Sequence, residues 1–173
     1  NPRKGLVGNL EAMVGQRTVL GDSSGKGSNF RLFAQFEQFI PLSKRWVCHY
    51  NITFESYNAP VIYSNECFRF GGLTSLRGFN EENFLATTRS LAQIELRYLL
   101  DLNSAVFLFY DQSIYENRSN SNYMRDQPFG FGFGANIGSP IGIFSIVYAL
   151  GVQQNNPLDA RAGKIHFGYI AYF

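Results

Sequence analysis

The sequence is poor in charged residues and in cysteine. Asp, Glu, Lys and Arg make up 16% of its 173 residues, below the ~25% of an average soluble domain. The net charge of +2 gives no broad attraction for nucleic acid, so we expect no nucleic-acid partner. Cys48 and Cys67 lie far apart and lack the spacing of metal ligands, and we expect two structural thiols.

Long apolar runs and catalytic motifs are also missing. No window approaches the ~18 continuous apolar residues of a membrane-spanning helix. There is no phosphate-binding loop and no Gly-x-Ser-x-Gly elbow, and the two histidines, His49 and His166, are isolated. Glu95 and Asp111 could form an acid pair, but an arginine partner explains them better. We therefore expect no enzymatic activity, no cofactor and no metal.

Aromatic residues and glycine are abundant. The chain has 17 Phe, 10 Tyr and 17 Gly, with a mean hydropathy of −0.13. Glycine, β-branched and aromatic residues interrupt every candidate helix, which favours strands. Two classes fit: a soluble, aromatic-rich β domain, or a membrane β-barrel, whose apolar face is hidden in the sequence by alternation.

Alternation with a period of two predicts strands along most of the chain. In the second predicted strand, Phe30, Leu32, Ala34 and Phe36 oppose Arg31, Phe33, Gln35 and Glu37. We predict eight strands, at about residues 4–16, 29–40, 44–56, 87–100, 104–115, 128–137, 141–151 and 162–173.

The connections between these strands alternate between long and short. Residues 41–43, 101–103 and 138–140 are short turns, and the others, 17–28, 57–86, 116–127 and 152–161, are long and polar. Short turns at one end and long loops at the other are typical of outer-membrane barrels. We predict an all-β, transmembrane, antiparallel up-and-down barrel of eight strands. It would form one domain over residues 1–173, with a long external loop at about 57–86, in contact with the lipid bilayer and lipopolysaccharide.

Four segments resemble, in order, motifs of the bacterial surface antigen superfamily, which includes the assembly protein BamA and the two-partner secretion transporters. FGGLTSLRGF (70–79) is similar to the motif of the family's inward-folding loop, and IELRY (94–98) to the following strand. FYDQS (109–113) is similar to the F-x-D segment. HFGYIAYF (166–173) is similar to the C-terminal β-signal, with a small residue at Ala171, and its signal residues are His166, Gly168, Tyr169, Ala171 and Phe173. The resemblance implies a bacterial outer-membrane location.

Glu95 and Asp111 are predicted to point into the lumen from adjacent strands, because their alternate neighbours are apolar. Arg77, at the head of the long loop with Gly78 and Phe79, could then be held by both carboxylates, since charge-assisted bonds to a guanidinium are strong. The ring of Phe109 offers a stacking surface. We interpret this group as a lock that holds the loop inside the barrel; the alternative is that Arg77 is a solvated loop residue.

The segment PFGFGFGAN is predicted to place three phenylalanines on one face and three glycines, Gly130, Gly132 and Gly134, on the other. Glycine within a strand often marks the close approach of another backbone. We expect the Arg77 segment, with its own Gly71 and Gly72, to pack there.

Three functional hypotheses follow. The first is a compact eight-stranded barrel that works in outer-membrane biogenesis or binds partners. The second is the C-terminal half of a sixteen-stranded pore for protein insertion or secretion, which would receive client strands at an edge. The third is a homodimer of two half-barrels, and other outer-membrane assembly components are further candidate partners.

Overall fold

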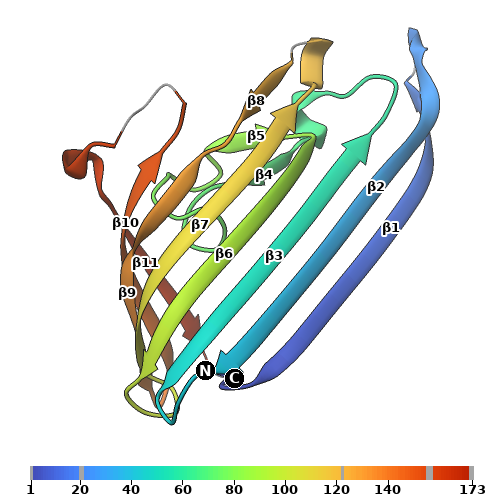
Figure 1. Cartoon of the computed structure of the whole chain (residues 1–173). Helices are drawn as coiled ribbons and strands as arrows, with labels where there is room; N and C mark the ends of the chain where they lie inside the picture. The colour runs from blue at the N-terminus through green and yellow to red at the C-terminus, as the bar shows by residue number, and fades with distance from the viewer. Residues whose placement is uncertain (1, 20–21, 122, 155–157, 172–173) are drawn as a thin grey trace.

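The computed structural model describes residues 2–19, 22–121, 123–154 and 158–171 (Figure 1). Over these residues the chain forms strands joined by turns and three short 3-10 segments, η1 (Ser64–Glu66), η2 (Ser119–Ser121) and η3 (Ala160–Ala162). The strands are β1 (Gly5–Val19), β2 (Asp22–Pro41), β3 (Trp46–Asn58), β4 (Phe68–Phe70), β5 (Phe84–Ala86), β6 (Thr88–Leu99), β7 (Ala105–Asn117), β8 (Met124–Asp126), β9 (Phe129–Ser139), β10 (Gly142–Val152) and β11 (Lys164–Ala171). Within the described part of the chain, no helix has the length and apolar character needed to cross a membrane.

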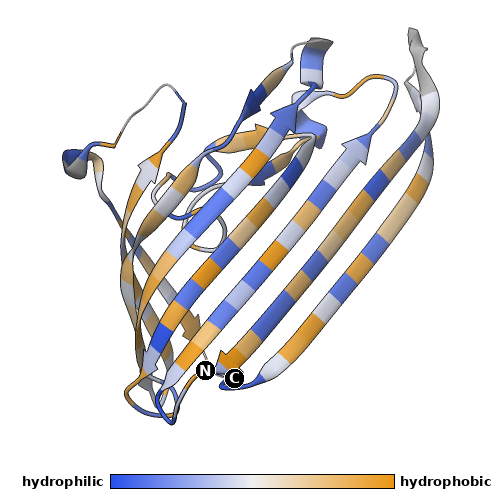
Figure 2. Ribbon diagram, viewed as in Figure 1, coloured by the Kyte–Doolittle hydropathy of each residue, from blue (hydrophilic) through white to orange (hydrophobic). Residues whose placement is uncertain are grey.

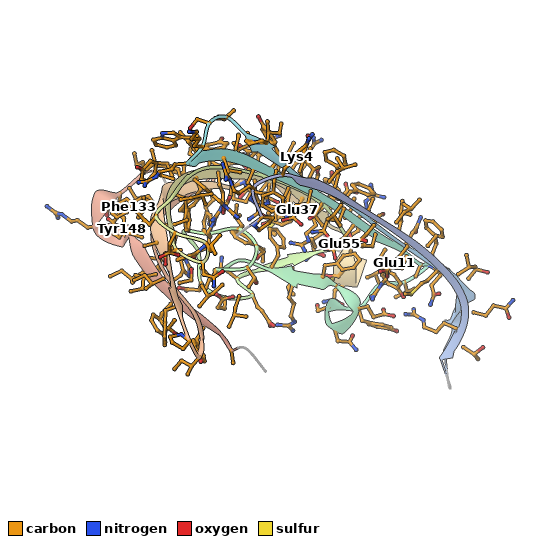
Figure 3. The ribbon with its side chains drawn as sticks, turned by 90° about the horizontal axis from the view of Figure 1, so that it is seen from below. Lys4, Glu11, Glu37, Glu55, Phe133 and Tyr148 are labelled. Atoms are coloured by element: carbon orange, nitrogen blue, oxygen red, sulfur yellow. The ribbon has the colours of Figure 1, made fainter. Side chains whose placement is uncertain are left out.

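The long strands form one antiparallel sheet in the order β1-β2-β3-β6-β7-β9-β10-β11. Each long strand therefore lies beside the long strand that precedes it, and the small β8 pairs with β7. The prediction of an all-β, antiparallel, up-and-down sheet is confirmed. Strands β4 and β5 pair separately, on the inner side of the curved sheet (Figure 3).

The sheet does not close into a ring, and the prediction of a closed eight-stranded barrel is wrong in this respect. The ladders join consecutive members of the path only, so that β1 and β11 are the two edges of the described sheet. Viewed from below, the sheet is an open arc with β1 at one extremity (Figure 3). The segment that contains β4 and β5 occupies the concave side of this arc, where the wall of a narrow barrel would otherwise return.

Register places apolar side chains on the convex face of the sheet. Phe36 lies opposite Ile52, and Ile52 lies opposite Ala92 on the other side. Leu108 and Phe133 are likewise paired and remain 61% and 57% exposed. The alternation appears as bands of hydrophobic and hydrophilic residues along each strand (Figure 2). A continuous exposed apolar face is what a lipid-facing sheet requires.

Two predicted loops contain strands. The predicted loop 17–28 is mostly part of the β1–β2 ribbon, whose ladder continues to Val19 opposite Asp22. Its glycine and serine content suggested a loop, but pairing between the two strands holds the segment extended. The long loop 57–86 contains β4 and β5, and the loop 116–127 contains β8.

The core of the molecule lies inside the arc. Its main apolar cluster joins the long loop to the concave face of the sheet through Phe70, Leu76, Phe79, Phe84 and Tyr115. Ring centroids within this cluster are 4.9–5.4 Å apart, as for Phe79 with Phe84 and for Phe84 with Tyr115, which is the range in which aromatic pairs attract. The loop is therefore packed against the sheet as part of the fold.

Candidate functional site

The Arg77 loop (residues 71–83) enters the concave face through three glycines with positive φ. Gly71, Gly72 and Gly78 have φ values of 118°, 95° and 94°, which side chains disfavour. The turn is closed by the N–H of Gly71, which donates to Ser75 Oγ at 2.8 Å, and by the N–H of Gly72, which donates to the Leu76 carbonyl at 3.0 Å. This geometry turns the Arg77 side chain toward the sheet.

Arg77 binds one carboxylate on each of two adjacent strands. Its Nε and Nη2 donate to Asp111 Oδ2 and Oδ1 at 2.7 and 2.6 Å, which is a two-pronged contact. Its Nη1 donates to Glu95 Oε1 at 2.5 Å, and its backbone N–H donates to Asp111 Oδ2 at 3.2 Å. The structure thus brings together Arg77, Glu95 and Asp111, the three charged residues that the sequence analysis grouped.

The arginine is buried and stacked on an aromatic ring. Its guanidinium carbon lies 3.7 Å from the centre of the Phe109 ring, and the side chains of Arg77 and Asp111 are only 5% and 0% exposed. Burial alone would lower the pKa of Arg77, but its hydrogen bonds and charge interactions with Asp111 and Glu95 outweigh burial and raise the pKa. Arg77 therefore remains charged, and its charge offsets those of its partners.

The sequence analysis did not include the cluster on the other side of Glu95. Arg97 Nη2 lies 2.6 Å from Glu95 Oε2, and His49 Nδ1 lies 3.3 Å from the same oxygen. His49 Nε2 lies 2.8 Å from Glu37 Oε1, and its ring stacks on Phe39 at 4.4 Å. The signal was present in the period-two alternation, but these contacts depend on the register between β2, β3 and β6, which the sequence leaves open.

A row of side-chain amides links the edge strand β1 to the Arg77 loop. Asn9 donates to Gln35 at 3.2 Å, Gln35 donates to Asn51 at 3.2 Å, and Asn51 donates to Gln93 at 2.9 Å. Gln93 then donates to the carbonyl of Ser75 at 2.7 Å. This polar row crosses β1, β2, β3 and β6, and its last member holds the loop backbone.

The glycine face of β9 meets the loop at one position. A Cβ atom added to Gly130 would lie 1.9 Å from the carbonyl oxygen of Arg77. The corresponding positions at Gly132 and Gly134 meet the Tyr148 carbonyl and the Phe107 ring instead, at 2.0 and 2.5 Å. Gly151 on β10, which the sequence analysis did not single out, lies against the carbonyl of Gly78, 2.6 Å from an added Cβ.

The C-terminal strand β11 also contacts the loop. The N–H of Gly78 donates to His166 Nε2 at 3.2 Å, and the side chain of Leu73 lies against Gly168. Tyr169 points to the convex side, where its hydroxyl donates to the Ile141 carbonyl at 2.7 Å. Ala171 pairs with Gly142. Phe173 lies outside the described residues.

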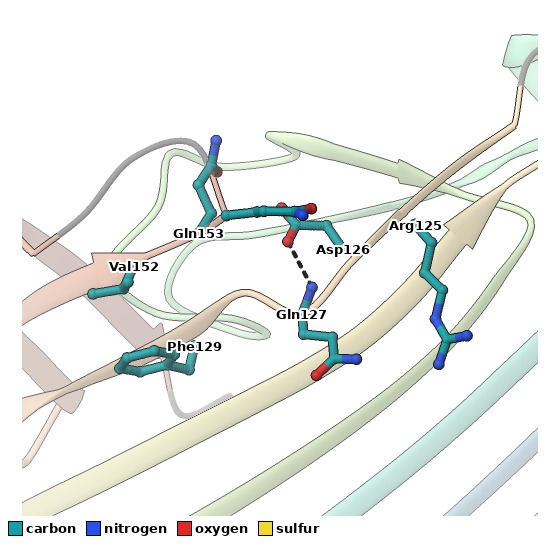
Figure 4. A pocket seen from close by; sticks show the side chains of 7 residues that line it. Arg125, Asp126, Gln127, Phe129, Val152 and Gln153 are labelled. Carbon is teal, nitrogen blue, oxygen red and sulfur yellow. Dashed lines mark hydrogen bonds between the residues drawn. The ribbon is translucent and has the colours of Figure 1, made fainter.

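A separate pocket of about 500 Å³ lies at the loop end of the sheet, near Arg125, Gln127 and Phe129 (Figure 4). The N–H of Gln127 donates to Asp126 Oδ1 at 2.7 Å in this pocket. It shares no residue with the Arg77 contacts. Across the described residues, no group of three or more His, Cys, Asp or Glu side chains is arranged to hold a metal ion, and Cys48 and Cys67 are free thiols.

The ordered motifs, the inward loop and the curved sheet can be compared with known families. Residues 1–169 match the Omp85 superfamily domain. The chain belongs to the Omp85 superfamily. The resemblance to the BamA-like surface antigens is thereby confirmed, and it extends over nearly the whole Omp85 chain. Comparison with curated proteins found no match.

Proposed function

We propose that this Omp85 chain is the C-terminal half of a larger outer-membrane β-barrel that inserts or secretes proteins. The observation that carries the proposal is the position of the long loop inside an open sheet. An eight-stranded ring is just wide enough to be filled by its own side chains. Here the concave side also holds the Arg77 loop, β4 and β5, so a ring around them needs more wall than these strands provide.

The two edges of the sheet support the same proposal. In lipid, every backbone N–H and C=O group must be paired, so spanning sheets close or join other strands. The β1 strand carries exposed apolar residues on the convex side, with Leu10 and Val14 76% and 78% exposed. We infer that further strands pair with β1 and with β11 and complete the wall.

The concave face near β1 suits a water-filled interior. Asn9 and Glu11 point to this side and are exposed, in contrast to the buried Arg77 group further along the arc. A wide polar lumen beside an anchored loop fits a pore or an assembly platform rather than a solid plug. An edge strand able to accept a client strand by backbone pairing would complete the proposed activity, which is non-enzymatic.

The proposal can be tested in the source cells with an antibody raised against the loop segment 116–127. We expect the outer-membrane fraction to contain a polypeptide far larger than the 19.6 kDa of this chain. A polypeptide of 19.6 kDa that runs natively as one chain would contradict the proposal and favour a compact barrel. A polypeptide of 19.6 kDa with twice that native mass would contradict it in favour of two half-barrels.

A further inference from the structure

The short-turn end of the sheet carries a concentrated positive charge. Arg3, Lys44 and Arg45 surround a pocket of about 330 Å³, together with Leu100 and Leu102. The two leucines are 52% and 87% exposed, which is unusual for turn residues that face water alone. Cations beside exposed apolar residues are the combination expected at the boundary between a lipid headgroup and its acyl chains.

The backbone holds the cations of this pocket at one place. Arg3 Nη2 donates to the carbonyl of Lys44 at 2.5 Å, so the N-terminal segment is fastened to the β2–β3 turn. The Leu99 N–H donates to the carbonyl of Arg45 at 2.8 Å, which joins this turn to the end of β6.

The pocket also contains one acidic residue, Asp101. Its Oδ1 accepts hydrogen bonds from the N–H groups of Asn103 and Ser104 at 2.8 and 2.6 Å, which lower the pKa of Asp101. The carboxylate is therefore ionised but engaged by its own turn. With three cations and one anion, the pocket keeps a net positive charge.

An apolar groove begins beside this pocket on the convex face. It has a volume of about 700 Å³ and is lined by Trp46, Tyr98, Leu108, Phe133 and Ile146, among others. Phe133 and Tyr148, another lining residue, lie on the outer side of the arc (Figure 3). The groove follows the strands away from the turns and is wide enough for an acyl chain.

Tyr98 connects the basic pocket with the groove. Its hydroxyl accepts a hydrogen bond from Arg45 Nη1 at 3.2 Å, and its ring packs edge-on against Trp46 at 5.0 Å. Aromatic residues with one polar end favour the interface between headgroups and acyl chains. The two cavities are thus continuous in chemistry, from charged through amphipathic to apolar.

We propose that the basic pocket and the groove together bind one anionic phospholipid of the leaflet that meets the short turns. Its phosphate lies at Lys44 and Arg45, and an acyl chain lies along the groove past Trp46. The positive charge of the pocket favours a headgroup with net negative charge over a zwitterionic one. This inference rests on the proposed membrane location.

Trp46 is the single tryptophan of the chain, and its fluorescence therefore reports on the groove. The full chain would be reconstituted into vesicles that contain a small fraction of phosphatidylglycerol or of phosphatidylcholine, each with brominated acyl chains, which quench tryptophan on contact. We expect phosphatidylglycerol to be enriched at Trp46 by roughly five- to twenty-five-fold over phosphatidylcholine, from about fivefold for each of two cations.

The variant Lys44→Gln/Arg45→Gln is expected to lose this enrichment, and Lys44→Arg/Arg45→Lys is expected to retain it. The control Arg69→Gln/Arg125→Gln removes the same charge from exposed positions outside the basic pocket and should leave the enrichment unchanged. Equal quenching by the two lipids, or enrichment that survives in Lys44→Gln/Arg45→Gln, would overturn the headgroup site alone. Quenching by neither lipid would place Trp46 outside the bilayer and overturn the membrane location as well.

Discussion

Arg77 and Arg97 together balance Glu95 and Asp111 on the concave face. Glu95 shares its two oxygens between the two arginines, while Asp111 gives both of its oxygens to Arg77. All of these side chains are at most 13% exposed, so each charge depends on its partners for the solvation it has lost. At the residue scale, the site is a neutral cluster of four groups in which Arg77 is contributed by the loop.

Replacement of Arg77 by alanine should destabilise the fold strongly. The change leaves Asp111 and one oxygen of Glu95 buried without their cation, for which a loss of about 3–5 kcal/mol in the free energy of unfolding is expected. The measurement is equilibrium unfolding in urea in the presence of lipid vesicles. Arg69→Ala is the matched control, because Arg69 and Glu82 are 3.8 Å apart and 53% and 66% exposed, and its loss should stay below about 1 kcal/mol. Equal losses in the two variants would contradict the role of Arg77.

A methyl group at Gly130 should push the Arg77 loop away from the sheet. The added Cβ would meet the Arg77 carbonyl, and overpacking of this kind costs about 1–3 kcal/mol. We expect Gly130→Ala to increase cleavage of the Arg77 loop in limited proteolysis. Gly8→Ala adds the same methyl group on β1 where no atom lies within 4 Å, and it should leave cleavage unchanged. A loop that stays protected in Gly130→Ala would show that this contact is not needed.

The alternation of residues gave Glu95, Asp111 and Phe109 a common face, and a buried guanidinium was the natural partner for the two carboxylates. The sequence could not give the cluster of Arg97, His49 and Glu37, because their contacts require three strands in one register. The glycines of β9 were grouped by type, yet only Gly130 meets the loop directly. Such close approaches depend on where the loop backbone runs, which alternation does not determine.

At the scale of elements, the β1–β2 ribbon is held by the long loop. Arg17 at the end of β1 pairs with Glu66 and also donates to the Val61 carbonyl at 2.6 Å. Gly27 on β2 lies against Pro60. The composition of residues 17–28 is that of a turn, and the prediction of a loop was wrong because these tertiary contacts and the strand pairing outweigh local preference.

The attachment of this ribbon should weaken in acid. Burial raises the pKa of Glu66, but the hydrogen bond from Arg17, with those from the Tyr63 N–H and the Tyr57 hydroxyl, outweighs burial and leaves the pKa below its usual 4.5. The stabilisation is therefore present above about pH 4.5 and is lost as the pH falls through the depressed value. We expect amide hydrogen exchange at residues 14–18, corrected for its intrinsic pH dependence, to accelerate in this window.

The variant Glu66→Gln should show faster exchange at neutral pH and no further change in acid, since it has no carboxylate to protonate. Glu82→Gln is the matched control, because Glu82 is exposed and pairs with Arg69 at 3.8 Å, away from Arg17. It should retain the pH response of the unmodified chain. Exchange that accelerates equally in Glu66→Gln and in the unmodified chain would assign the effect to another group.

At the scale of the whole molecule, strand order and faces followed from periodicity and connection length, whereas closure did not. Closure depends on the volume enclosed and on which strands are available to pair with the edges. The sequence indicated a long inward loop and left open whether an eight-stranded ring could contain it. The open arc, with the Arg77 loop packed on its concave side, favours a wider wall.

A disulfide test at the sheet edges addresses the central claim most directly. In a Cys48→Ser/Cys67→Ser background, Leu10→Cys would be combined in turn with Ile165→Cys, Phe167→Cys and Tyr169→Cys, which place thiols on the convex face of β1 and β11. The control pair, Leu10→Cys/Ala34→Cys, joins direct partners on β1 and β2 and should oxidise within one chain. We predict no disulfide within one chain for any β1–β11 pair, and the formation of one would show a closed eight-stranded barrel and contradict the account.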